Sequence, residues 1–508
     1  MTAGIRCSSR IGCLRRLRRV LARAVACVAL GSAAQQPQFN FTDRDDGISC
    51  TYFDVGLLIA WPKGRPLWTD AGGQPDGPRA LAVDRASGDD TRRVRRIDVT
   101  RSVQSLWAGG AKPYALMLRN EEGSIVSFHS REAADPASRP QLLLQAADGR
   151  KRYLEPAADA TLDCSTYRGL GRAPVLSVRR ENWIALRFDI EAARKLLGSA
   201  PTHAELVLVR TPDDKSGSFR LSAFMLRPPY DDSQEQRAGG IAARYPDDRG
   251  IATDPEVFFA DGFESRTLDA RWNRGMRAPF EFVDEDRKRG FAPLSGRALR
   301  VTIPRGELLG LDLRYRFRDH HGAEPTEVYF RYYLRLAPSW LLATQGGKLP
   351  GLAGTYGKAG WGGRKWDGAQ GWSARGSYGA TPPEGHPARG QTLLGTYAYH
   401  SGSSGYGEGF GWTGAGLAGL VQPDRWYCIE QRLKINTPGR EDGVLQVWID
   451  GRMALSREGL RLRDVDALRI EEVWMNFYHG GTEPAPVEMH AYIDSVVVAR
   501  SYVGMLSR

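Results

Sequence analysis

The sequence predicts an all-β protein with two globular units. At 508 residues, the chain is longer than one hydrophobic core usually organises. Its 58 glycines and 10% aromatic residues are typical of a turn-rich β protein rather than a helix bundle. Short segments that alternate apolar and polar residues recur along the chain between Gly, Asp and Pro turns. Together these observations favour sheets packed on sheets.

Residues 1–34 are predicted to be a secretory signal peptide. The segment holds seven arginines and no acidic residue. Six of the arginines precede an apolar stretch from Val20 to Leu30, which Arg23 interrupts, and small residues at 31–34 fit a cleavage site. A basic amphipathic surface helix or a mitochondrial presequence are the alternatives for this segment. The apolar stretch is shorter than the roughly 20 residues that a membrane-spanning helix needs. We therefore expect a secreted protein, extracellular or periplasmic, without a membrane span.

The same leader explains most of the positive charge. Its seven arginines account for seven of the eleven net positive charges, so the remaining chain is only mildly basic. No later block of Lys and Arg suits the tracking of a phosphate backbone. A nucleic-acid partner is not expected.

Three cysteines remain beyond the leader, at Cys50, Cys164 and Cys428. In an oxidising compartment, we predict a disulfide between Cys50 and Cys164, which both lie in the first half, and a buried free thiol at Cys428. No C-x-x-C spacing is present, so zinc and thioredoxin-like chemistry are not supported.

The first unit, residues 35–230, is predicted to be a β-sandwich accessory module. Strands are expected at 96–99 and 204–209, with one helix at 190–197. A polar stretch without apolar periodicity, 231–256, is predicted to be a linker. The second unit is expected to occupy 257–508.

Two segments of the second unit predict a sheet with one apolar and one polar face. In 328–336, alternation places Arg331 and Tyr333 on the same face. In 473–478, it places Trp474, Asn476 and Tyr478 together. A hairpin is expected at Asp450-Gly451. Between 346 and 419, frequent glycines accompany tryptophans such as Trp361 and Trp372, as in loops that present rings to a sugar.

Three short motifs of the second unit carry a resemblance to a known family. They are Gly-Gly-Lys-Leu-Pro-Gly-Leu at 346–352, Gly-Trp-Ser-Ala-Arg at 371–375 and Tyr-Ala-Tyr at 397–399. In this order they resemble the alginate and glucuronan lyases of polysaccharide lyase family 14 and its relative family 20. Trp-Ile-Asp-Gly at 448–451, Asn-Phe-Tyr-His-Gly-Gly at 476–481 and Tyr-Ile-Asp-Ser at 492–495 add to the likeness, which spans about half of the chain.

The resemblance implies a β-jelly roll, a concanavalin-like sandwich, whose cleft takes a polyuronate such as alginate or glucuronan. Carried over, its catalytic residues are Lys348, Ser373, Arg375, Tyr397 and Tyr399. The region 360–379 is longer and richer in Trp and Gly than is expected for an alginate lyase. This departure affects the expected identity of the substrate more than the expected type of reaction. The first unit resembles DNRLRE-type carbohydrate-binding modules, on residues 97–100, 103–107, 130–132 and 139–140, with 185–189 in permuted order.

Elimination between C4 and C5 of a uronate needs its carboxylate neutralised, the C5 proton removed and the departing O4 protonated. The guanidinium of Arg375 suits the carboxylate, and Ser373 could add a hydroxyl donor from the same strand face. Lys348 is expected to be the proton acceptor or a second carboxylate clamp. Tyr399, beside Tyr397, is our candidate for the acid. The structural alternatives are a surface ion pair for Arg375, a solvated loop lysine for Lys348 and an aromatic cross-strand stack for the two tyrosines.

The remaining candidates are assigned to substrate binding, metal binding or neither. The predicted substrate-binding residues are Arg331, Tyr333, Trp361, Trp372, His400, Asn476, Tyr478 and His479. A structural calcium is considered at Glu264 and Asp494, with Asp261 nearby, and no cofactor is required. We expect a monomer.

Two rival functions stay open at this point. A non-catalytic glycan-binding protein would keep the aromatic rings without eliminating. A jelly-roll glycoside hydrolase would need two carboxylates that flank the scissile bond, for which Glu430 and Glu472 are the candidates.

Overall fold

The structure is a computed structural model that describes residues 47–54, 59–61, 65–108, 114–122, 124–164, 169–227, 237, 239–275, 280–382, 384, 386, 388–403, 405–414 and 418–507. The predicted signal peptide lies outside these residues. No helix in the described ranges is both long enough and apolar enough to cross a membrane.

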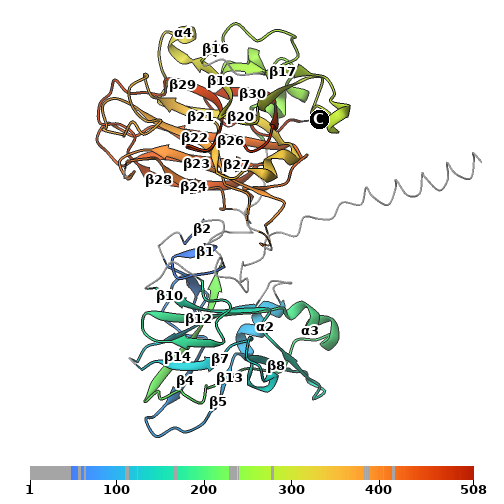
Figure 1. Cartoon of the computed structure of the whole chain (residues 1–508), viewed down its shortest axis with the longest axis vertical. Coiled ribbons are helices and arrows are strands. Elements are labelled where there is room, and N and C mark those ends of the chain that lie inside the picture. Colours follow the sequence, from blue (N-terminus) through green and yellow to red (C-terminus); the bar gives the residue numbers. More distant parts are fainter. Residues whose placement is uncertain are drawn as a thin grey trace, which may run out of the picture. The chain divides into compact units, whose positions relative to one another are not determined.

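The first unit is formed by antiparallel sheets, as the sequence predicts (Figure 1). The larger sheet has the order β10-β12-β6-β14-β3, with β4 also paired to β14, and the second has the order β5-β13-β8-β9. Two smaller pairs are β11-β7 and β1-β2. The strands are β1 (Tyr52–Asp54), β2 (Ile59–Ala60), β3 (Leu67–Thr69), β4 (Ala82–Ala86), β5 (Val94–Asp98), β6 (Tyr114–Asn120), β7 (Val126–His129), β8 (Gln141–Gln145), β9 (Lys151–Leu154), β10 (Ala158–Asp163), β11 (Val175–Val178), β12 (Asn182–Phe188), β13 (His203–Val209) and β14 (Phe219–Arg227).

Helices α2 (Thr100–Ala108) and α3 (Ile190–Leu197) and the 3₁₀ turn η1 (Pro136–Ser138) complete the first unit. The bounds of α3 are those that the sequence predicts. Asp189 caps its start by accepting a hydrogen bond from the backbone N–H of Glu191, and Gly198, with φ of 75°, ends it. Between the sheets, side chains such as Leu118, Leu142 and Leu206 are fully buried.

The predicted disulfide is confirmed. Cys50 and Cys164 are bonded across 114 residues of sequence. Cys428 is a buried free cysteine, also as predicted. Burial raises the pKa of its thiol to about 12, so it stays protonated at neutral pH.

The second unit packs two large antiparallel sheets against each other. The sheet with the order β17-β18-β30-β20-β26-β27-β28, to which β15 adds by pairing β30, is called the β30 sheet. The sheet with the order β16-β19-β29-β21-β22-β23-β24, to which β25 adds by pairing β23, is called the β29 sheet. Figure 1 labels seven strands of the β29 sheet, which are β16, β19, β21, β22, β23, β24 and β29.

The elements of the second unit are β15 (Val257–Asp261), β16 (Asn273–Arg274), β17 (Phe280–Val283), η5 (Arg287–Arg289), β18 (Ala298–Ile303), β19 (Leu309–Arg316), α4 (Phe317–His321), β20 (Glu327–Leu336), η6 (Pro338–Leu342), β21 (Gly347–Gly354), β22 (Trp372–Tyr378), β23 (Thr392–Tyr399), β24 (Glu408–Gly411), β25 (Leu420–Val421), β26 (Tyr427–Lys434), β27 (Gly443–Ile449), β28 (Arg452–Leu460), β29 (Glu472–His479) and β30 (Met489–Ala499).

One apolar layer lies between these two sheets. Phe330 and Tyr332 of β20 meet it from one side, and Met475 and Phe477 of β29 from the other. Strand alternation puts the residues between them on the outer faces, as the sequence predicts. The hairpin between β27 and β28 is also confirmed: Asp450 and Gly451 both have positive φ, at 48° and 75°.

The described part of the predicted linker is packed structure. Residues 241–253 form three 3₁₀ turns, η2 (Ile241–Arg244), η3 (Pro246–Asp248) and η4 (Ile251–Thr253). Ile241 and Ile251 are buried against Val497 and Val503 on the outer side of the β30 sheet. Their burial removes apolar surface from water, which a free linker would not do.

Replacing both Cys50 and Cys164 by serine should lower the free energy of unfolding of the first unit by about 4 kcal/mol, because the cross-link restricts a long loop in the unfolded chain. Urea unfolding followed by tryptophan fluorescence measures the loss. Cys428→Ala, which removes a thiol without removing a cross-link, is the control and should change stability much less. An unchanged midpoint in the double variant would contradict the prediction.

Candidate functional site

A row of polar and aromatic side chains lies on the face of the β29 sheet that points away from the core. It follows from alternation, since Val473, Met475 and Phe477 enter the core and their neighbours cannot. We call this surface the polar face; it comprises Asp312, Arg314, Lys348, Ser373, Arg375, Tyr397, Tyr399, Glu472, Trp474, Asn476 and Tyr478.

Strand register brings Trp474, Arg375 and Tyr397 into one line across the polar face. Gly351 is opposite both Trp474 and Arg375, and Arg375 is opposite Tyr397. Because Gly351 has no side chain, the guanidinium of Arg375 can lie above the indole of Trp474, 4.6 Å from the ring centroid. A Cβ at Gly351 would come within 2.5 Å of the backbone of Ala374 and Arg375. Only glycine fits this contact.

Arg375 is a buried cation without an acidic partner. Its side chain is 7% exposed and donates one hydrogen bond, to Oδ1 of Asn476 at 3.1 Å. Its Nε has no hydrogen-bond partner, and no carboxylate of the described ranges forms an ion pair with it. Burial lowers the pKa of the guanidinium to about 10, so it remains charged at neutral pH. An anionic ligand would satisfy it.

Lys348 lies near the guanidinium of Arg375, and the pKa of its amino group is well below that of an ordinary lysine. Its Nζ lies 3.8 Å from the ring centroid of Tyr397, and no ion pair to it is found among the described residues. Burial, and secondarily the charge of Arg375, lower the pKa of Lys348 to about 7. A neutral amine is therefore available near neutral pH. That is the state in which lysine can accept a proton.

The two tyrosines of β23 are in contact, as predicted for residues that alternate on one strand. Their rings meet edge to face with centroids 5.7 Å apart. The phenolic oxygen of Tyr399 accepts a hydrogen bond from the backbone N–H of Gly363 at 3.2 Å. Accepting this bond leaves the hydroxyl proton of Tyr399 free to be donated. Burial raises the pKa of Tyr397, which keeps that phenol protonated.

Ser373 is on the polar face, but its hydroxyl is already used. The residue is fully buried, and Oγ donates to the carbonyl oxygen of Gly360 at 2.5 Å. The sequence predicts that this hydroxyl donates to a substrate carboxylate, whereas in the structure it donates to the backbone. Together with the Gly363–Tyr399 bond, it ties the glycine-rich segment between β21 and β22 to the sheet.

Trp361 and Trp372 are placed differently from each other. Trp372 is fully buried in the core between the sheets, so its prediction as a substrate-binding residue is wrong. The reason is alternation: if Ser373 and Arg375 face outward, Trp372 must face inward. Trp361 lies in the glycine-rich segment, half-buried, with the guanidinium of Arg364 4.1 Å from its ring.

The two predicted histidines do not reach the polar face. His479 is fully buried and its Nδ1 lies 3.1 Å from the carbonyl oxygen of Glu483. Like Phe477, it is on the inward side of β29. His400 is 5% exposed, with Nε2 2.7 Å from Oε2 of Glu408. Both histidines are engaged in local contacts within the protein, so their assignment to substrate binding is corrected. Asn476 and Tyr478 do lie on the polar face.

Arg331 and Tyr333 belong to the other sheet. They are on the outer side of β20, where Arg331 is fully buried and paired with Asp248 of η3. The hydroxyl of Tyr333 accepts a hydrogen bond from the backbone N–H of Leu506. The shared face was predicted correctly, but the two sheets have opposite outer sides. The assignment of both residues to the same site as Lys348 is therefore corrected.

A further group of polar residues on β19 and β29 is not predicted from the sequence. Arg314 is held by Asp312 at 3.3 Å and Glu472 at 3.1 Å, and its guanidinium lies 4.5 Å from the ring centroid of Trp474. Trp474 thus contacts two guanidinium groups, those of Arg314 and Arg375. The alternation of Asp312, Arg314 and Arg316 along β19 was the signal that could have found it.

The predicted calcium ligands Glu264 and Asp494 are close enough to interact. Burial, with a smaller contribution from Glu264, raises the pKa of Asp494 to about 8, and its Oδ2 has no hydrogen-bond partner. Both oxygens of Asp261 are used, by the backbone N–H of Phe263 and the indole N–H of Trp272. Within the described ranges, no group of three or more acidic, His or Cys residues is arranged to hold a metal. A structural calcium stays a prediction.

One part of the second unit matches a known protein family. Residues 410–493 match the family model described as polysaccharide lyase 14. A search of curated proteins gives no match.

Several solved structures are similar to less than half of the chain at low identity. An alginate lyase from Aplysia kurodai is 19% identical, over 44% of this chain and 87% of that one, with a TM-score of 0.33. An alginate lyase from Chlorella virus is 18% identical, over 43% and 91%, with a TM-score of 0.33. An endo-beta-1,4-glucuronan lyase from the fungus Trichoderma reesei is 12% identical, over 48% and 96%, with a TM-score of 0.33. Within the second unit, the family match covers the part of the chain from β24 to β30.

Proposed function

We propose that this protein is a secreted enzyme that cleaves a uronate-containing polysaccharide of the alginate or glucuronan type by β-elimination. The observation that carries the proposal is the pairing of two buried or half-buried cations, Arg375 and Lys348, which have no acidic partner among the described residues. Desolvated charges are costly unless they are compensated. A carboxylate of the substrate supplies that compensation.

Arg375 is assigned to the carboxylate of the uronate at the cleavage point. Its free Nε and the remaining guanidinium donors can bind both carboxylate oxygens, and Asn476 holds the group in place. As the C5 proton leaves, negative charge develops on this carboxylate as an enediolate. A fixed cation in a site with little water stabilises that charge more than the ground state, which lowers the barrier.

Lys348 and Tyr399 are assigned to the two proton transfers. The neutral amine of Lys348 accepts the C5 proton, the C5–H electron pair forms the C4–C5 double bond, and the C4–O4 bond breaks. Tyr399 donates its proton to the departing O4. The Gly363 N–H bond to the tyrosine oxygen then stabilises the phenolate, which regains a proton before the next cycle.

The two carboxylates that a glycoside hydrolase would need do not lie together in this structure. Glu430 is on β26 of the β30 sheet, where it accepts hydrogen bonds from the backbone of Val503 and Gly504. Glu472 is on the β29 sheet, paired with Arg314 and Arg316. Carboxylates on two different sheets cannot flank one glycosidic bond. Sugar binding by the first unit stays a prediction.

The full-length protein should release products with an ultraviolet-absorbing C4–C5 double bond from alginate or polyglucuronate. Lys348→Ala and Tyr399→Phe should each lower the rate at least about a hundredfold, because each removes a proton-transfer group. Ser377→Ala, on the same sheet, is the matched control, because the Ser377 side chain forms no hydrogen bond within the described part of the chain. Saturated products with new reducing ends, or binding of every polyuronate without turnover, would overturn the proposal.

The activity should rise with pH around a midpoint near 7. Lys348 is protonated, and unable to accept a proton, below its lowered pKa of about 7, and neutral above it. Arg375→Gln removes a neighbouring positive charge that helps to lower this pKa. Any residual activity of that variant should therefore show a midpoint at higher pH, whereas Arg457→Ala, an exposed arginine of β28, should leave it in place. A shift of the midpoint to lower pH in Arg375→Gln would contradict the assignment.

Ser373 is proposed to act as a positioning residue. Ser373→Ala leaves the carbonyl of Gly360 without its donor and should lower the free energy of unfolding by about 1–3 kcal/mol. Because the same segment supplies the Gly363 N–H to Tyr399, kcat should fall while KM changes little. Ser373→Thr, which keeps the hydroxyl, should restore part of kcat. A Ser373→Ala variant with full kcat would show that the hydrogen bond between Ser373 and Gly360 does not affect catalysis.

A further inference from the structure

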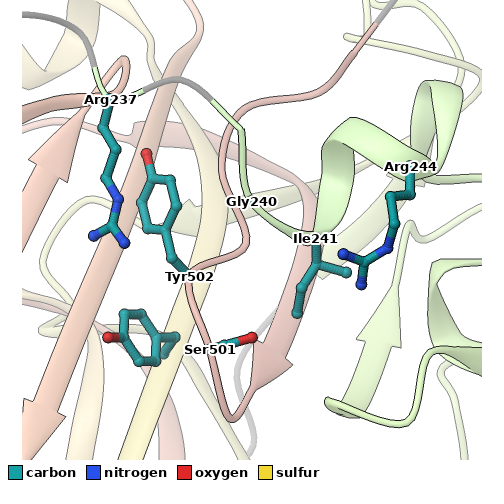
Figure 2. Close-up of a pocket in the computed structure, with 7 residues that line it drawn as sticks. Arg237, Gly240, Ile241, Arg244, Ser501 and Tyr502 are labelled. Carbon is teal, nitrogen blue, oxygen red and sulfur yellow. The ribbon is translucent and has the colours of Figure 1, made fainter.

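A second cationic and aromatic surface exists on the outer face of the β30 sheet. There a hollow of about 320 Å³ is lined by Arg237, Arg244, Tyr329, Ser501 and Tyr502, together with the backbone at 240–241. Tyr329 is on the outer side of β20, because Val328 and Phe330 enter the core. Both sheets and their apolar layer therefore separate this hollow from the polar face. Figure 2 shows the two arginines on opposite sides of it, with Tyr502 and Ser501 between them.

Arg237 is an exposed cation that is held in place by rings rather than by an acid. Its guanidinium carbon lies 4.0 Å from the ring centroid of Tyr502 and 5.4 Å from that of Trp448. Its side chain has no ion pair or hydrogen bond within the described part of the chain. Stacking leaves all the guanidinium N–H donors available in a fixed plane. This is the geometry that binds a carboxylate with two parallel hydrogen bonds.

The opposite wall adds a second positive charge. Arg244 is paired through one nitrogen with Asp254 at 2.5 Å, and 59% of its side chain is exposed. None of the residues that line the hollow is acidic. Asp254 compensates Arg244. Arg237 has no direct ion pair within the described part of the chain and interacts electrostatically with the buried carboxyl of Glu430, whose pKa burial raises to about 7. The site therefore attracts an anion with one negative charge.

Two aromatic rings, those of Tyr329 and Tyr502, line the hollow, and both lie near the buried indole of Trp448. Tyr502 lies 5.3 Å from Trp448, and Tyr329 lies 6.5 Å from Trp448 with the ring planes 22° apart. Aromatic rings pack against the C–H faces of sugars, and phenolic hydroxyls can bind sugar hydroxyls. Carboxylate recognition beside such rings suits a sugar acid better than an inorganic anion, which needs no apolar contact.

We propose that this hollow is an auxiliary binding site for a uronic acid unit of the polysaccharide, separate from the site of cleavage. The identity of the polymer rests on the proposed function. A chain bound at the hollow raises the local concentration of the polymer near the enzyme, so that dissociation from the polar face need not release the substrate. Arg237 binds the carboxylate, and Tyr329 and Tyr502 contact the sugar ring.

Binding can be measured without turnover in full-length Lys348→Ala protein, by its retardation in native gels that contain alginate or polyglucuronate. In this background Arg237→Ala should weaken binding about tenfold, the loss expected for one charge-assisted contact. Arg237→Lys, which keeps the charge but not the planar fork, should bind with intermediate strength. The matched control is Arg249→Ala, an arginine of the same segment whose side chain is 83% exposed, and it should bind like the parent.

Equal retardation of Arg237→Ala and its parent would overturn the proposal, as would an equal loss in Arg249→Ala, which would indicate unspecific charge attraction. If thermal melting shows that Arg237→Ala is unfolded, folded Arg237→Lys decides, and undiminished binding by it would also overturn the proposal. The two proposals fail separately. Wild-type protein that releases no unsaturated product, while retardation still depends on Arg237, refutes the elimination and leaves the auxiliary site standing.

Discussion

The packing of the β29 and β30 sheets across one apolar layer is the constraint on which the second unit depends. Every strand that contributes Leu, Val or Phe to this layer must turn its alternate residues outward. In β22, burial of Trp372 and Ala374 commits Ser373 and Arg375 to the polar face. The core therefore selects the face on which chemistry can occur, before any interaction among the polar residues is considered.

Exclusion of water from the charged side chains is the second constraint on the site. Arg375 and Arg314 lie on Trp474, which excludes water from their flat faces while leaving N–H donors at the edges. Arg314 is compensated by Asp312 and Glu472, whereas Arg375 has only the neutral Asn476. The uncompensated charge acts on Lys348, whose ammonium form is destabilised by burial and by this neighbour. In the proposed mechanism, the unpaired guanidinium therefore binds the substrate carboxylate and also contributes, after burial, to the lowered pKa of Lys348.

The glycine-rich segment between β21 and β22 is joined to this chemistry by two hydrogen bonds of its backbone. The carbonyl of Gly360 accepts from Ser373, and the N–H of Gly363 donates to Tyr399. Gly360 and Gly363 have φ of 84° and 78°, a conformation that other residues adopt only with strain. Backbone geometry therefore favours glycine at both positions. The segment is an ordered part of the site, not a loose insertion.

Much of this could be predicted from the chain itself. Periodicity of two along 328–336 and 473–478 determined which residues share a face, Asp450-Gly451 determined a hairpin, and Cys50 and Cys164 were assigned to each other. The alternation and the turn are local properties, because both depend on neighbours in sequence, whereas the disulfide follows from the number and position of the cysteines. The motifs at 346–352, 371–375 and 397–399 also pointed to residues that the structure does bring together.

Assignment of each face to a sheet needed the tertiary structure. Arg331 has the same local pattern as Arg375, yet it faces the 3₁₀ turns that cover the other sheet, and Asp248, 83 residues earlier in the chain, neutralises it. His400 and His479 resemble ligands in sequence, but packing gives them partners within the protein. The sequence alone determined the alternation, the turn and the residue types of the site. Tertiary structure decided which polar residues meet and which cations remain unpaired, because both depend on strands that are distant in the chain.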